Sequence, residues 1–80
     1  MSFPLWTRTA ESVRYEVHSV HAGDDGQWLV PVRVIGMSGF VVLFWPDENA
    51  ISGWPPGHPR DLKESLEEWL AIVHDNMSKR

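Results

Sequence analysis

The chain has 80 residues, a formal net charge of −4 at neutral pH, no cysteine and five tryptophans. This length predicts one domain with one small core, and the lack of cysteine excludes disulfides and thiolate metal sites. No basic region followed by a long apolar run opens the chain, and the longest apolar run, residues 40–45, is too short to cross a membrane. We therefore expect a single soluble, cytoplasmic domain over residues 1–80.

The first part of the chain predicts an arm followed by a strand. Residues 1–12 are expected to form an irregular N-terminal arm that packs its aromatic side chains onto the body, because Pro4 opposes an early helix. Residues 13–20 alternate apolar and polar side chains, which is typical of a half-buried strand. The Asp25-Gly26 pair that follows is a strong signal for a hairpin turn.

The next two predicted strands differ in the side chains that their faces carry. The strand predicted at residues 27–35 contains Pro31, which cannot donate to a ladder and should lie at an edge or a bulge. The strand at residues 40–45 is apolar on both faces, and a short fourth strand is expected within 50–54. One helix can cover only one face of such a sheet, so the other face needs the N-terminal arm or a second copy.

Residues 59–77 predict one amphipathic helix after a proline-rich connector. Its apolar side chains recur at helical spacing within one stripe, namely Leu62, Leu66, Trp69, Leu70, Val73 and Met77. The order predicts an α+β fold. In this fold, residues 13–54 form an antiparallel three- to four-stranded β-meander, and one C-terminal amphipathic helix packs on one face of it.

Acidic residues gather on this helix and on the turn before it. Residues 40–76 carry seven acids against two bases. Such a surface repels nucleic-acid backbones and suits a basic partner protein, although a merely solvated helix face is the plainer alternative. Trp54 and Trp6 lie in segments predicted to be irregular, and at least one is expected to be exposed. The predicted partner-binding residues are Glu64, Glu67, Glu68, Asp75, Asp47, Glu48 and Trp54.

The sequence offers no constellation for catalysis or for a cofactor. The four histidines lack the spacing of a zinc site, and a site for any metal is not expected. The paired acids Asp24-Asp25 and Asp47-Glu48 lie in predicted turns, where neighbours do not converge on a substrate as a general acid and base must. Residues 36–39 (GMSG) lack the strand–turn–helix context of a hydrolase nucleophile. We expect neither an enzyme nor a cofactor-binding protein.

Two resemblances bear on function. Residues 39–47 (GFVVLFWPD) and 61–66 (DLKESL) resemble HicB-type antitoxins, in which a strand ending in Phe-Pro-Asp precedes a short strand and a helix opening Thr-Leu-Glu-Glu-Ala-Leu. Here Trp45 interrupts the Phe-Pro-Asp motif, and no DNA-binding element follows. The short, acidic, cysteine-free profile also resembles phage-encoded inhibitors of anti-CRISPR type. Both resemblances imply a small protein that sequesters a larger, nucleic-acid-handling effector through its surface.

The sequence therefore predicts a non-enzymatic, acidic protein-binding module, namely a bacterial or phage inhibitor that acts as a monomer or homodimer. Its expected partner is a protein with a basic surface, with no direct nucleic-acid binding and no membrane contact. The alternative is a structural or oligomerisation module that uses the outer apolar face of residues 40–45. A small-molecule pocket between helix and sheet is a third, weaker alternative.

Overall fold

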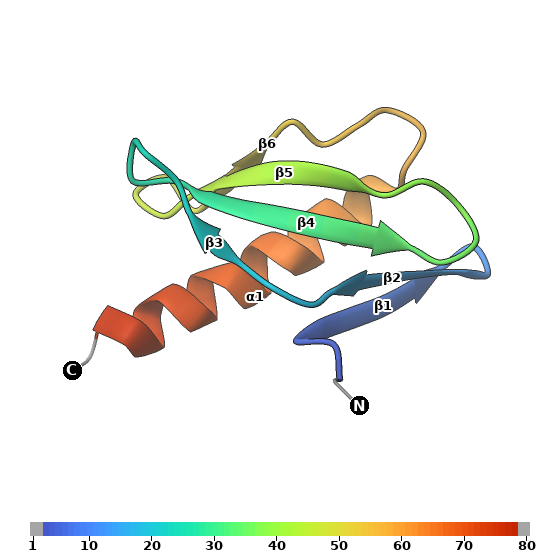
Figure 1. The fold of residues 1–80 in the computed structure, drawn as a ribbon, viewed down its shortest axis with the longest axis horizontal. Helices are drawn as coiled ribbons and strands as arrows, with labels where there is room; N and C mark the ends of the chain where they lie inside the picture. Colours follow the sequence, from blue (N-terminus) through green and yellow to red (C-terminus); the bar gives the residue numbers. More distant parts are fainter. Residues whose placement is uncertain (1–2, 79–80) are drawn as a thin grey trace.

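The computed structural model describes residues 3–78 and consists of one curled antiparallel sheet crossed by one helix (Figure 1). The strand order is β1-β2-β4-β5-β6, and β3 pairs separately with β4. The elements are β1 (Trp6–Ala10), β2 (Val13–Val17), β3 (His21–Ala22), β4 (Trp28–Val34), β5 (Phe40–Trp45), β6 (Ala50–Ser52) and α1 (Arg60–Ser78). The predicted α+β class with a C-terminal helix is confirmed, but the sheet has six strands instead of three or four.

The prediction that residues 1–12 form an irregular arm is wrong for five of them, because Trp6–Ala10 is strand β1. It pairs with β2 from Trp6 opposite Val17 to Ala10 opposite Val13. The two residues between the strands, Glu11 and Ser12, both have positive φ (52° and 65°), which is the two-residue type I′ turn that matches strand twist. This turn usually carries Asn-Gly, so Glu-Ser gave no signal. The first two residues of the predicted arm lie outside the described part of the chain.

The tight turn leads to a first prediction. Ser12 holds a left-handed conformation that costs an L-residue roughly 1–2 kcal/mol and costs glycine almost nothing, partly offset by glycine's greater entropy when unfolded. Ser12→Gly is therefore expected to raise the free energy of unfolding by about 0.5–1 kcal/mol in urea denaturation. Ser38→Gly is the control, since Ser38 is exposed and is not among the positive-φ residues; it should be neutral or slightly destabilising. A loss of stability in Ser12→Gly would contradict the turn.

An irregularity divides the strand predicted at residues 13–20. Tyr15 pairs with Val34, whereas His21 pairs with Leu29. The chain thus advances six residues from Tyr15 to His21, opposite only five residues of β4. One extra residue between β2 and β3 is the signature of a β-bulge, which bends a strand and increases its twist. The bulge separates β2 from β3 and contributes to the curl of the sheet.

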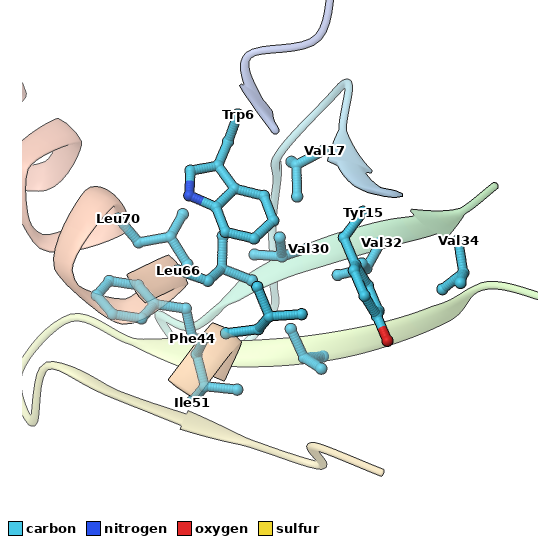
Figure 2. Packing of buried hydrophobic residues seen from close by; sticks show 12 residues of the cluster. Trp6, Tyr15, Val17, Val30, Val32, Val34, Phe44, Ile51, Leu66 and Leu70 are labelled. Atoms are coloured by element: carbon cyan, nitrogen blue, oxygen red, sulfur yellow. The ribbon is translucent and has the colours of Figure 1, made fainter. Parts of the chain in front are cut away.

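The core lies between the concave face of the sheet and α1 (Figure 2). Alternate residues of β2, β4 and β5 point inward, as the period of two predicts, and the helix contributes the centre of its apolar stripe. The buried residues are Trp6, Tyr15, Val17, Val30, Val32, Val34, Val42, Phe44, Ile51, Leu62, Leu66 and Leu70. The described residues contain no helix with the length and apolar character that crossing a bilayer requires.

The helix α1 contacts both outer strands of the sheet, β1 and β6. At β6 the link is polar: the backbone N–H of Ile51 donates to the Glu67 carboxylate at 2.8 Å. Lys63 lies 3.5 Å from the same carboxylate oxygen, one helical turn before it. An edge strand exposes unpaired backbone groups that invite other strands, and covering them with a helix removes that hazard. Glu67 therefore holds the helix against the sheet.

Candidate functional site

Two acidic segments that are far apart in sequence border one hollow on the molecule. The hollow lies between the β5–β6 turn and the middle of α1, and its lining residues are Pro46, Asn49, Glu68, Ala71, Ile72, His74 and Asp75. Asp47 and Glu48 stand between two of these residues and are exposed at the tip of the turn. No lysine or arginine is among the lining residues. We call this surface the acidic hollow. Of the predicted site residues, Glu68 and Asp75 line it, whereas Asp47 and Glu48 lie beside it in the turn.

Ile72 gives the acidic hollow an apolar element that was not predicted. Its side chain is 54% exposed, although large apolar residues are more often buried. Glu68 and Asp75 lie four residues before and three residues after it, so the three side chains share one helix face. The sequence does carry a signal for this arrangement, since Ile72 is an isoleucine outside the apolar stripe. The helix face thus combines one exposed apolar side chain with flanking carboxylates.

The predicted acidic residues of α1 differ in their surroundings. Glu64 lies one turn before Glu68 on the same side of the helix, and both are exposed, as is Asp75. Glu67 is instead half-buried, and its carboxylate receives the Ile51 N–H and the Lys63 ammonium described above. The structure therefore places Glu67 in a link between helix and sheet, apart from the acidic hollow.

The expectation that Trp54 or Trp6 is exposed is wrong. Trp6 is 4% exposed and belongs to the core. Trp54 is half-buried, because the proline-rich connector folds back over the end of the sheet. Its ring packs edge-on against Phe40 with centroids 5.2 Å apart, and its indole N–H donates to the carbonyl oxygen of His58 at 3.3 Å. Trp54 thus fixes the connector and lies among residues other than those of the acidic hollow.

A tyrosine–histidine pair holds the same connector to β2. The Tyr15 hydroxyl and His58 Nδ1 are hydrogen-bonded at 2.8 Å, and the His58 ring also packs on Phe40 with centroids 4.9 Å apart. Burial raises the pKa of Tyr15, and the negative charge of Glu11 raises that pKa further, so the hydroxyl stays protonated at neutral pH. Each partner packs against apolar or aromatic neighbours, and we assign the pair a structural role.

The geometry also bears on two other types of site, a metal site and a small-molecule site. Among residues 3–78, no group of three histidine or acidic side chains is placed to hold a metal ion. A groove between β3–β4 and the end of α1 has a volume of about 190 Å³ and is lined by Val20, His21, Ala22, Trp28, Val73 and Met77. Pockets for drug-sized ligands usually measure about 300–1,000 Å³. This groove is therefore small for the third alternative, a small-molecule site. A second hollow, between β1 and the start of α1, has a volume of about 630 Å³ and lies within that range, with Arg8, Glu11 and Asp61 among its lining residues.

Comparison of the chain with family models, curated proteins and solved structures finds no match. The resemblances to HicB-type antitoxins and to anti-CRISPR proteins therefore stay predictions. The candidate site rests on the geometry of the acidic hollow alone.

Proposed function

We propose that the protein is a non-enzymatic binding module that captures a basic partner protein on the acidic hollow. The observation that supports this most is the hollow between the β5–β6 turn and α1, where Glu68 and Asp75 flank the exposed side chain of Ile72 and the acidic turn forms the other border. Two separate segments contribute to one surface, which the solvation of a single helix face does not require. An apolar contact inside a charged rim is the usual layout of a protein interface.

The chemistry of this surface favours a particular class of partner. Proteins that handle nucleic acids carry lysine and arginine patches that neutralise phosphates. A carboxylate-lined surface competes for such a patch and accelerates association by electrostatic attraction. We infer that the partner is a nucleic-acid-handling effector and that the module acts as a bacterial or phage inhibitor, in line with the resemblances of anti-CRISPR and antitoxin type. The same negative charge disfavours direct binding to DNA or RNA.

Charge reversal on the helix tests this function. In Glu64→Lys with Glu68→Lys, capture of the basic partner is expected to fall at least tenfold, because two attractive charges become repulsive. The assay immobilises the protein, exposes it to nuclease-treated bacterial lysate and quantifies the captured proteins by mass spectrometry. Capture by the unaltered protein should also fall between about 50 and 500 mM salt, because salt screens exposed charges.

A matched variant separates the site from the net charge. Asp24→Lys with Asp25→Lys makes the same change in total charge on the exposed turn before β4, which lies at the same end of the sheet as the β5–β6 turn but contributes no lining residue to the acidic hollow. This control should retain capture, and both double variants should melt within a few degrees of the unaltered protein, since exposed substitutions usually change stability by about ±0.5 kcal/mol. Equal capture by the two folded double variants would reject the acidic hollow as the binding surface.

A further inference from the structure

The outer face of the sheet, opposite the helix, carries a contiguous apolar patch. Across β4 and β5, Pro31 pairs with Val41 and Leu29 pairs with Leu43, and these side chains alternate with the buried ones. Val41 is 58% exposed. One expectation was that the N-terminal arm covers this face. It does not, because β1 lies at the edge of the sheet and its Trp6 enters the core (Figures 1 and 2). No segment of residues 3–78 therefore covers the patch.

This patch is symmetric about its middle. The buried pair Val30–Val42 separates the Pro31–Val41 row from the Leu29–Leu43 row. Each row holds two apolar side chains of similar size. Two copies in face-to-face contact can be related by a twofold axis that lies in the contact plane and crosses the strands at Val30 and Val42. This axis places the Pro31–Val41 row of one copy on the Leu29–Leu43 row of the second copy. Isologous contacts need this kind of self-complementarity.

The two ends of the patch carry opposite charges. Arg33 lies at one end of β4, and among the described residues no carboxylate lies within 4 Å of its guanidinium. Asp47 and Glu48 lie at the other end, in the turn that follows β5, and neither forms an ion pair with the part of the chain that the structure describes. A second copy that is reversed end to end brings each unpaired arginine toward the unpaired carboxylates of the other copy.

Shape agrees with the same reversal. A shallow hollow lies at the end of the β4–β5 hairpin, where Gly39 has no side chain to oppose Arg33; Pro31, Ile35, Met37 and Val41 are among its lining residues. Trp45 projects from the outer face at the opposite end of β5, with its indole N–H bonded to the Ser52 hydroxyl at 3.0 Å. Gly39 lies three residues before Val42, and Trp45 lies three residues after it. The twofold axis therefore places Trp45 of one copy at the position of Gly39 in the other copy.

We propose that two copies of this chain form a dimer through the outer faces of β4 and β5, with the strands of one copy running end to end against those of the other. The Pro31–Val41 row packs on the partner subunit's Leu29 and the partner subunit's Leu43. Trp45 enters the partner's hairpin hollow, and Arg33 approaches the partner's Asp47 and the partner's Glu48. The dimer and the proposed function both involve Asp47 and Glu48, but Glu68 and Ile72 remain on the helix side of each copy, so variants at Leu29 and Val41 test the dimer apart from the proposed function.

The size of the patch sets the expected strength of the dimer. A strand of six residues is about 20 Å long, and the two strands β4 and β5 together span about 10 Å, so their outer faces cover about 200 Å² per copy. Stable interfaces of standard size bury about 800 Å² per partner. The dimer is therefore weak, and it should form only toward the upper end of the concentration range that is tested.

Sedimentation velocity from about 2 µM to 1 mM tests the dimer on the full chain. The unaltered protein should shift from the mass of one chain to that of two across this range. Leu29→Glu with Val41→Glu should weaken the dimer at least tenfold without unfolding the protein, because both side chains are exposed. Ile72→Glu is the matched control, since Ile72 is as exposed as Val41 but lies on the helix, and its dimer should be unchanged.

Charge exchange tests the orientation. The dimer should be weakened by Arg33→Glu alone and also by Asp47→Arg with Glu48→Arg. The variant that combines all three substitutions should restore the dimer, because the charges at both ends of the patch are then reversed. A protein that stays monomeric at 1 mM would overturn the proposal, as would a dimer that Ile72→Glu disrupts and the double glutamate variant does not. A dimer that the double glutamate variant disrupts but the charge variants leave unchanged would overturn the end-to-end orientation.

Discussion

Leu66→Ala is expected to lower the free energy of unfolding by about 2–5 kcal/mol, the loss that buried leucines show when a cavity replaces the side chain. Leu66 has no exposed surface and lies in the middle of the helix stripe, against the core residues of the sheet (Figure 2). A domain of 80 residues is stabilised by only about 4–12 kcal/mol in total. The substitution therefore removes a large share of the stability, and thermal or urea melting would measure the loss.

Two further variants show whether burial is the cause. Ile72→Ala removes a similar apolar side chain from the exposed face of the same helix and should change the stability by about ±0.5 kcal/mol. Trp69 belongs to the predicted stripe but is only half-buried, so Trp69→Ala should cost less than the full loss expected for a buried tryptophan. If Leu66→Ala melted at the same temperature as Ile72→Ala, the docking of the helix against the sheet would be wrong.

Gly39→Ala is expected to destabilise the fold by about 1–3 kcal/mol or more, as overpacking does. A Cβ atom built at Gly39 would lie 2.4 Å from the carbonyl oxygen of Val32 in the neighbouring strand. That neighbour is backbone, so the two strands must separate to make room. The pairing of β4 with β5 forms the centre of the sheet, and its loss would show in the amide hydrogen exchange of both strands.

Ser38→Ala provides the matched comparison, because it changes the adjacent residue in the same exposed turn and makes no demand on strand spacing. It should melt within a few degrees of the unaltered protein. Equal melting of the Gly39→Ala and Ser38→Ala variants would show that β4 and β5 tolerate a wider separation at this point.

The sequence was most informative where a single element shows its own period. The helix predicted at residues 59–77 is observed at Arg60–Ser78, and the strand at residues 40–45 has the predicted bounds. The inward side chains of β2, Tyr15 and Val17, follow from the alternation of apolar and polar residues predicted for residues 13–20. These features depend on residues close together in the chain, and local patterns of that kind are the most reliable.

The features that sequence reasoning missed depend on residues distant in the chain. β1 could not be recognised because its turn has atypical residues. In addition, Trp6 is buried only by its packing in the core together with residues of the helix, which are distant in the sequence. The burial of Trp54 needs Phe40 and His58 on either side of it. Similarly, both acidic segments of the candidate site were predicted, but the hollow that they border follows from the docking of α1 beside the β5–β6 turn.

The contact of α1 with both outer strands has a consequence for how the chain folds. The first strand and the last helix close the structure together, so these contacts join residues from opposite ends of the sequence. Contacts of such long sequence separation slow folding, because the entropy of closing the loop is lost before the contact forms. During synthesis β1 therefore has no helix to pack on until residues 60–78 have left the ribosome. The domain should acquire its fold only when α1 has formed, in one late and cooperative step.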